Sequence, residues 1–117
     1  MNPEIKTKWT EALRSGEFKQ GTRALKRDDR FCCLGVLCEL YRREHADKVS
    51  WTTRSRDGRH HEYLDAHVGT SFLPRPVMDW AELQHPDPLL GEDTAVHHND
   101  SAGLTFESIA DLIDEHL

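Results

Sequence analysis

The stretch Phe31-Cys32-Cys33-Leu34-Gly35-Val36-Leu37-Cys38-Glu39-Leu40 is the one long apolar run in this polar chain, so the remainder has to pack against it. Apolar residues recur at helical spacing from Leu34 onward, which predicts a helix, with residues 31–33 as a short strand before it. Glu39 falls on the water-facing side of that helix. Gly35 is costly inside a helix and predicts a close approach of its backbone to another element or to a ligand.

The three cysteines of this run are predicted to be buried free thiols. Cysteine is among the most buried residue types, and an odd number of cysteines suits a reducing compartment. A zinc site is disfavoured, because the adjacent pair Cys32-Cys33 lacks the spacing of chelating cysteines. The adjacent pairs His60-His61 and His97-His98 are predicted to be surface residues for a similar reason.

Length and composition predict one domain, residues 1–117, with a small core. The apolar share is 37% and the mean hydropathy is −0.71. No apolar run has the length of a membrane span, and the first residues lack the features of a signal peptide. We therefore expect a cytoplasmic protein.

Charge is divided unevenly along the sequence. All 15 lysines and arginines lie between Lys6 and Arg75, and residues 1–75 contain 11 acidic residues. Residues 76–117 contain ten acidic residues and neither lysine nor arginine. This division predicts either acidic segments folded against basic ones, or a basic face that meets an anion and an acidic face elsewhere.

Helices are predicted at both ends of the chain and before its acidic part. The first begins after Asn2 as N-cap and ends at Ser15-Gly16, and the last begins after Thr105. A third helix is predicted within residues 73–83, where proline is tolerated in the first turn.

Hairpins and loops are predicted between these helices. Residues 17–30 are extended and form a first hairpin with residues 31–33, and residues 48–71 form a second, basic and mobile hairpin around Asp57-Gly58. Residues 84–93 are a loop, residues 94–97 a short strand and residues 99–103 a tight turn. The predicted fold class is α+β, with three to four helices packed on short antiparallel hairpins.

Catalytic motifs are missing from the sequence. It has no phosphate-binding P-loop, nucleophile elbow, zinc-protease helix or dinucleotide fingerprint. A cysteine nucleophile near the start of a helix is a weak alternative, because its apolar neighbours favour an inert thiol. We therefore expect a non-catalytic protein without metal or cofactor, with a small Cys/His hydrolase as the weaker alternative.

Anion binding is the chemistry that the sequence favours. Hydrogen-bond donors crowd the first hairpin between Lys19 and Arg30, and Gly21 would let a ligand approach backbone amides. Trp51 or Phe18 could stack on a base while arginines pair with phosphates. The alternative is that these charged residues are exposed to water and bind no ligand.

The dipeptide Asn99-Asp100 precedes the last helix and has two interpretations. It either forms a structural turn, or it donates and accepts hydrogen bonds at the polar edge of a bound base or ribose, next to the free backbone amides at the start of the helix. The complete set of predicted ligand-binding residues is Phe18, Lys19, Gln20, Gly21, Arg23, Trp51, Arg54, Arg56, Asn99, Asp100 and Thr105.

Four blocks of sequence in this order resemble a group of small bacteriophage and prophage proteins. They are Trp9 to Gly21, Phe31 to Cys38, Leu73 to Leu83, and Asn99 to Ile113. The resemblance covers nearly the whole chain. It implies a setting in the cytoplasm of an infected bacterium, where small phage proteins often counter host defence.

Within that setting the predicted function is sequestration of a small phosphorylated ligand, such as a cyclic nucleotide or an ADP-ribose-type immune signal. The alternative is a protein–protein inhibitor of a host defence factor that acts through the acidic C-terminal half. We expect a homo-oligomer and, in the alternative, a host protein as partner. Neither a membrane nor nucleic acid is expected as a partner.

Overall fold

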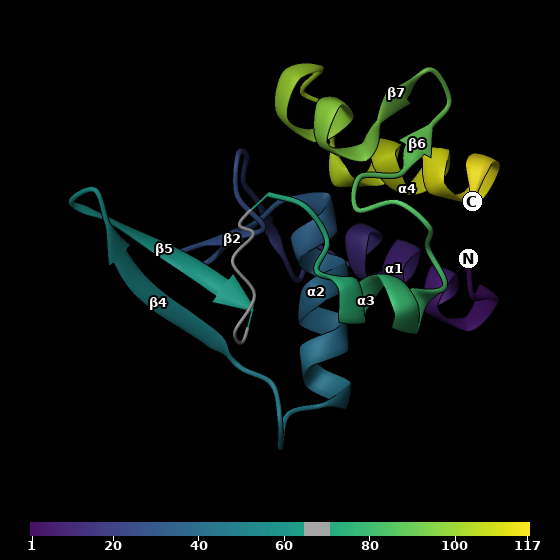
Figure 1. Ribbon diagram of the computed structural model, residues 1–117. Helices are drawn as coiled ribbons and strands as arrows, with labels where there is room; N and C mark the ends of the chain where they lie inside the picture. Colours follow the sequence, from purple (N-terminus) through teal and green to yellow (C-terminus); the bar gives the residue numbers. More distant parts are fainter. Residues whose placement is uncertain (65–70) are drawn as a thin grey trace.

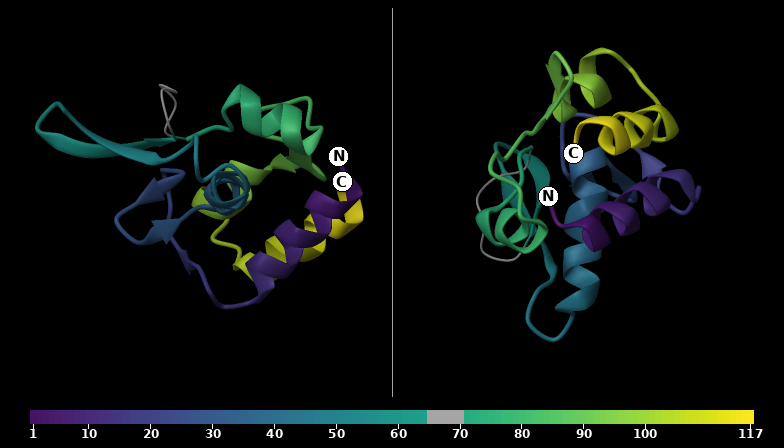
Figure 2. Two further views of the ribbon diagram at one scale, coloured as in Figure 1. Left: turned by 90° about the horizontal axis from the view of Figure 1, so that it is seen from below. Right: turned by 90° about the vertical axis from the view of Figure 1, so that its right-hand side faces the viewer.

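Helix α2 (Cys33–Glu44) lies at the centre of the computed structural model, which describes residues 1–64 and 71–117 (Figure 1). Cys32 is its N-cap, and the Sγ atom of Cys32 accepts a hydrogen bond from the amide of Gly35 at 3.4 Å. Viewed from below, α2 is seen nearly end-on with the other elements arranged around it (Figure 2, left). The long apolar run of the sequence therefore forms the core helix, as predicted.

Gly35 allows the chain before α2 to approach the helix closely. A Cβ atom built on Gly35 would lie 1.7 Å from the carbonyl oxygen of Leu25, a distance that no side chain tolerates. Leu25 is fully buried, and its carbonyl also accepts a hydrogen bond from the amide of Cys32 at 3.3 Å. Of the two alternatives open for Gly35, contact with another element explains the glycine.

Helices α1 (Pro3–Arg14) and α4 (Phe106–His116) lie side by side, and α1 also packs against α2 (Figure 2, left). Asn2 caps α1 by accepting from the amides of Glu4 and Ile5, and Thr105 caps α4 by accepting from the amide of Ser108. Both predicted caps are confirmed. Arg14 joins the two helices by ion pairs from α1 to acidic residues of α4.

A three-stranded sheet is built from β1 (Lys19–Gln20), β2 (Lys26–Arg27) and β3 (Arg30–Phe31). The strand order is β1-β3-β2, with β2 antiparallel and β1 parallel to β3. The antiparallel pair confirms the first hairpin, but the parallel pair was not predicted. The strand ends at Phe31, because Cys32 caps α2 and Cys33 is already helical.

The second hairpin consists of β4 (Trp51–Arg56) and β5 (Arg59–Leu64), and it projects from the body of the protein (Figure 1). Asp57 and Gly58 form its turn with positive φ angles of 52° and 74°. The predicted turn is thus confirmed. Residues 65–70, at the end of the predicted 48–71 segment, lie outside the described residues.

The acidic C-terminal part forms α3 (Arg75–Ala81), a small hairpin of β6 (Leu89–Leu90) and β7 (Asp93–Thr94), and α4. The predicted 84–93 loop therefore contains strands, which turn at Gly91 with a φ of 85°. The predicted strand at 94–97 is confirmed at Thr94 and is wrong beyond it, and the predicted tight turn at 99–103 is wrong. Residues 95–101 form a helical segment whose main part is the π-helical turn η1 (His97–Ser101).

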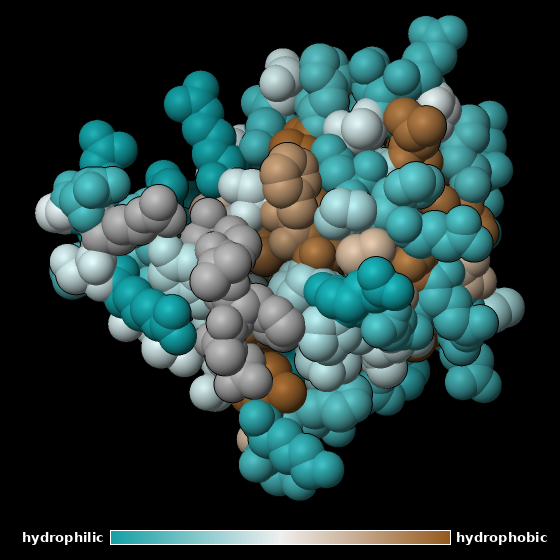
Figure 3. All heavy atoms as spheres, in the orientation of Figure 1, coloured by the Kyte–Doolittle hydropathy of each residue, from teal (hydrophilic) through white to brown (hydrophobic). Residues whose placement is uncertain are grey.

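The predicted α+β class is confirmed by four α-helices, one π-helical turn and short strand pairs within the described residues. No helix there combines the length and the apolar character that crossing a membrane requires. The face drawn in Figure 3 is mostly hydrophilic, with small and separate hydrophobic patches. A binding site on this face would therefore be recognised by its charged side chains and not by a large hydrophobic surface.

Candidate functional site

Three cations lie in a row across the exposed face of the β1–β3–β2 sheet. Lys19 of β1 is in register with Arg30 of β3, and Arg30 is in register with Arg27 of β2. Residues in register project from the same face of a sheet. Like charges directly opposite one another destabilise a strand pair by about 0.2–1 kcal/mol, so this arrangement costs stability.

Lys19, Arg27 and Arg30 differ in whether a carboxylate pairs with their charge. Lys19 donates to Asp29 at 3.0 Å, and this hydrogen bond lowers the pKa of the Asp29 carboxyl. Arg30 gives one Nη1–H to the carbonyl of Gln20 at 3.3 Å. Neither Arg27 nor Arg30 forms an ion pair with any acid in residues 1–64 and 71–117. Two guanidinium groups thus remain available to an external anion.

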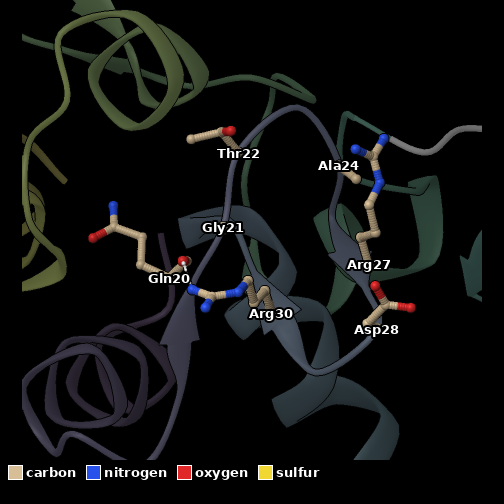
Figure 4. A pocket seen from close by; sticks show the side chains of 7 residues that line it. All are labelled: Gln20, Gly21, Thr22, Ala24, Arg27, Asp28 and Arg30. Carbon is tan, nitrogen blue, oxygen red and sulfur yellow. Dashed lines mark hydrogen bonds between the residues drawn. The ribbon is translucent and has the colours of Figure 1, made fainter.

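A cavity of about 340 Å³ lies beside these two arginines (Figure 4). In this view Arg30 reaches toward Gln20, while Arg27 extends on the opposite side next to Ala24. The full lining is Gln20, Gly21, Thr22, Ala24, Arg27, Asp28 and Arg30. This volume is at the lower end of the range for small-molecule sites. Asp28 contributes the one acidic group of the lining.

Gly21 makes room for Arg30 in this cavity. A Cβ atom on Gly21 would lie 2.8 Å from the Cβ atom of Arg30. The amide of Gly21 donates to the carbonyl of Phe31 at 2.8 Å, and its carbonyl accepts from Asn99 at 2.9 Å. Both backbone groups are therefore engaged within the protein, and the role of Gly21 is to admit the arginine side chain.

Asn99 holds the loop that carries the cavity. Its side chain is 1% exposed and makes four hydrogen bonds. Oδ1 accepts from Gln20 Nε2 at 3.0 Å and from the amide of Cys33 at 3.1 Å, while Nδ2 donates to the carbonyl of Gly21 and to Asp100. An asparagine side chain offers two acceptor and two donor positions, and all four are occupied. Asn99 thus fixes the loop and has no position left for a ligand.

Other predicted ligand residues belong to the same network. The Asp100 carboxylate accepts from the amide of Arg23 at 3.0 Å, and Arg23 has a positive φ of 66° that this bond stabilises. Gln20 Nε2 also donates to the carbonyl of Leu104 at 2.8 Å. Thr105 caps α4. The structure therefore brings Gln20, Arg23 and Asp100 together around the buried side chain of Asn99.

The two aromatic residues predicted to stack on a base lie away from this cavity. Phe18 packs edge-on against Phe31 with ring centroids 5.3 Å apart, and Arg43 covers its other side at 5.1 Å. Trp51 also packs against Phe31, and its indole N–H donates to Glu39 at 2.9 Å. Both rings are engaged at the border of the core, so neither lines the cavity.

Glu39 is buried, and its predicted position on the water-facing side of α2 is wrong. Its carboxylate accepts hydrogen bonds from Arg42 at 2.8 Å, from Arg43 at 3.0 Å and from Trp51. Burial alone would raise the pKa of Glu39, but these bonds outweigh it and lower the pKa to about 2. This cluster connects α2 to the β4–β5 hairpin and is a structural feature.

Another cavity lies at β5. It has a volume of about 320 Å³ and is lined by Arg27, Arg59, His60 and His61. Arg54 instead lies over the ring of Tyr63 at 5.4 Å. Arg56 is at the end of β4, and its side chain lies outside what the structure describes. The basic hairpin thus contributes a different arginine, Arg59, to the surface around Arg27.

The three cysteines are buried and free, as predicted. Burial raises the pKa of the Cys32 thiol to about 12, and it raises the pKa of Cys33 and of Cys38 well above the ordinary value. A reactive cysteine requires the opposite shift. Across the described ranges, no group of three His, Cys, Asp or Glu side chains is placed to hold a metal ion.

Sequence reasoning counted Arg27 and Arg30 among the donors of the first hairpin but did not select them as ligand residues. The signal was available, because Asp28-Asp29 is a two-residue turn that sets Arg27 opposite Arg30. It also missed Arg59, His60 and His61. Their proximity to Arg27 depends on the packing of β5 against β2, which no local pattern encodes.

Fold and site together define a small α+β domain with a cationic surface cavity over a three-stranded sheet. The family model that matches residues 1–117 is described as a domain of unknown function, DUF8296, and the chain belongs to this family. The comparison with curated proteins found no match. The comparison with solved structures found none either.

Proposed function

We propose that this protein is a non-catalytic binding protein that sequesters a small phosphorylated ligand. The binding site is the cavity beside Arg27 and Arg30. Guanidinium groups match phosphate oxygens in geometry and pair with them through short charge-assisted hydrogen bonds. A bound phosphate would also relieve the repulsion between the two arginines.

The observation that carries this proposal is that some arginines of this small domain form ion pairs with carboxylates, whereas the two beside the cavity form none within the described residues. Arg14, Arg42, Arg43 and Arg75 all pair with carboxylates. Arg27 and Arg30 are in register across a strand pair, border a cavity and have no acidic partner among the described residues. A costly arrangement of this kind is typical of a binding site, where local stability is exchanged for function.

The proposed ligand class is a nucleotide signal, such as a cyclic nucleotide or an ADP-ribose derivative. The support is the resemblance to small phage and prophage proteins, together with a cavity of about 340 Å³ that exceeds the needs of a bare phosphate. Under this proposal the protein lowers the free concentration of a host immune signal. It releases the ligand unchanged, because binding requires no reaction.

The test is a thermal-shift panel of cyclic mononucleotides, cyclic dinucleotides, ADP-ribose and pyrophosphate, followed by calorimetry on any ligand that binds. A ligand at 100 times its Kd stabilises the folded state by about 2.7 kcal/mol, which corresponds to a rise in Tm of roughly 10 °C. Chromatography of the ligand after denaturation of the complex then shows whether it was altered.

Two variants make the test specific. The double variant R27Q/R30Q should lose the thermal shift, while R75Q should keep it, because Arg75 is an exposed arginine already paired with Asp79. The proposal is abandoned if no member of the panel stabilises the wild-type protein, or if R27Q/R30Q responds like wild type. Recovery of a chemically altered ligand would replace sequestration by catalysis.

A further inference from the structure

Arg27 lines several cavities. One, of about 340 Å³, it shares with Arg30, and another, of about 320 Å³, it shares with Arg59, whereas a third, of about 350 Å³, has two acidic residues and no second arginine among the described residues of its lining. His60 and His61 complete the second lining. The strand β2 packs against β5, so the two cavities are neighbours on one continuous surface.

The side chain of Arg27 can serve both cavities at once. A guanidinium group carries five N–H donors in a planar fork, and its different edges can each meet an anion. Arg27 donates no hydrogen bond to any group of residues 1–64 or 71–117. Its full set of donors is therefore available on both sides.

Each cavity also has a second arginine of its own. Arg30 uses one of its donors on the carbonyl of Gln20, and Arg59 forms no ion pair with the acids that the structure describes. The one nearby glutamate, Glu62, is neutralised by Lys26. Among the described residues, the lining of the second cavity contains no acid and that of the first contains Asp28 alone. Both cavities are thus cationic, and they have Arg27 in common.

We propose that the ligand carries two separate phosphate groups, one held by Arg27 and Arg30 and the other by Arg27 and Arg59. This inference rests on the proposed function, because it specifies the ligand of the same site. A cyclic dinucleotide or a dinucleotide joined by a pyrophosphate has this chemistry. A mononucleotide occupies one cavity and leaves the second pair of cations unmatched.

The experiment measures binding of AMP, cyclic di-AMP and diadenosine pyrophosphate by isothermal titration calorimetry. These three probes share the same base, but the two-phosphate probes carry a second adenosine as well as a second phosphate. The loss of affinity in R59Q is therefore what identifies the contact with the second phosphate. We expect at least one two-phosphate probe to bind about 100-fold more tightly than AMP. The variants R30Q and R59Q should each weaken binding of that probe by about tenfold or more.

For AMP, one of the two variants should have little effect, because a single phosphate engages one cavity. R75Q is the matched control and should bind every probe like wild type. Far-ultraviolet circular dichroism confirms that each variant is folded, which is expected because Arg30 and Arg59 are exposed.

The outcomes separate this inference from the proposed function. If no probe binds to the wild-type protein, both are overturned. If the probes bind with dependence on Arg30 but R59Q leaves all of their affinities unchanged, the single-phosphate site stands and the two-phosphate inference is wrong. Equal affinity for AMP and for both two-phosphate probes also overturns it.

Discussion

Arg42 and Arg43 in α2, and Arg27 and Arg30 in the β2–β3 hairpin, are two pairs of arginines that the fold uses in opposite ways. The α2 pair surrounds the buried carboxylate of Glu39, together with the indole of Trp51. The hairpin pair faces its own like charge across a strand pair and borders a cavity.

The difference teaches that arginine content alone does not identify a binding site in this protein. Arg42 and Arg43 lie at i+3 and i+4 from Glu39 on one helix, so their charge is used within the fold. The turn between β2 and β3 has two acidic residues, yet one pairs with Lys19 and the other forms no ion pair in the described parts of the chain. What distinguishes the hairpin pair is that neither arginine forms an ion pair with a carboxylate of the described residues.

The largest effect is expected from removing the residue that holds the hairpin loop in place. Asn99→Ala leaves the amide of Cys33 and the carbonyl of Gly21 without their partner, in a site that is 1% exposed. We expect the free energy of unfolding to fall by about 3 kcal/mol, measured by urea denaturation. Ser101→Ala, an exposed change in the same π-helical turn, should stay within about 0.5 kcal/mol of wild type.

A slightly smaller effect is expected from breaking the structural cluster. Glu39→Gln removes the charge that Arg42 and Arg43 share in a buried position, so the free energy of unfolding at pH 7 should fall by about 2 kcal/mol. Glu44→Gln is the matched control, because that exposed carboxylate pairs with Lys8 at 3.3 Å. An equal loss of unfolding free energy in both variants would mean that the buried ion pairs of Glu39 stabilise the fold no more than the exposed ion pair of Glu44 does.

The same cluster predicts how stability depends on pH. The pKa of Glu39 is lowered to about 2 in the folded protein, so its stabilising contribution is complete above about pH 4.5. That contribution is lost as the pH falls from about 4.5 through 2. Urea denaturation between pH 2 and 7 should therefore show a difference between wild type and E39Q that shrinks toward low pH. A constant difference would contradict the assigned pKa.

The smallest effect has the opposite sign and concerns the hairpin pair. Arg27→Gln and Arg30→Gln should each raise the free energy of unfolding by about 0.2–1 kcal/mol, because each removes a repulsion between residues in register. Salt at 1 M should reduce this gain, since the Debye length is then about 3 Å. Arg42→Gln should instead lower the stability. A loss in all three variants would show that the two pairs do not differ.

Much of the fold was predictable because its signals are local. The caps Asn2 and Thr105, the turn Asp57-Gly58 and the helix after Phe31 follow from short patterns, and all appear as expected. The errors lie at residues 84–103, where β6, β7 and η1 replace a loop, a strand and a turn. Strands of two residues and a single π-helical turn are too short to leave a periodic pattern.

The predicted ligand-binding residues divide between the candidate cavity and the core. Donors between Lys19 and Arg30 do surround a cavity, whereas Phe18, Trp51 and Asn99 are used by the core and its network. Each of those three residues is as capable of binding a ligand as of serving the fold. Sequence spacing cannot show which partners a side chain finds among residues far along the chain.

The sequence by itself determined the core helix, the capped helices at both ends, the hairpin turns and the division of charge, because each depends on neighbouring residues. Tertiary structure decided which charges are neutralised. Glu39 forms ion pairs with Arg42 and Arg43, and three of the four hydrogen bonds of the Asn99 side chain join residues that are 66 to 79 positions apart in the sequence. Arg27 meets Arg59 through the packing of β2 against β5. Electrostatic and hydrogen-bond partners are set by distance in space, and that distance exists only in the folded chain.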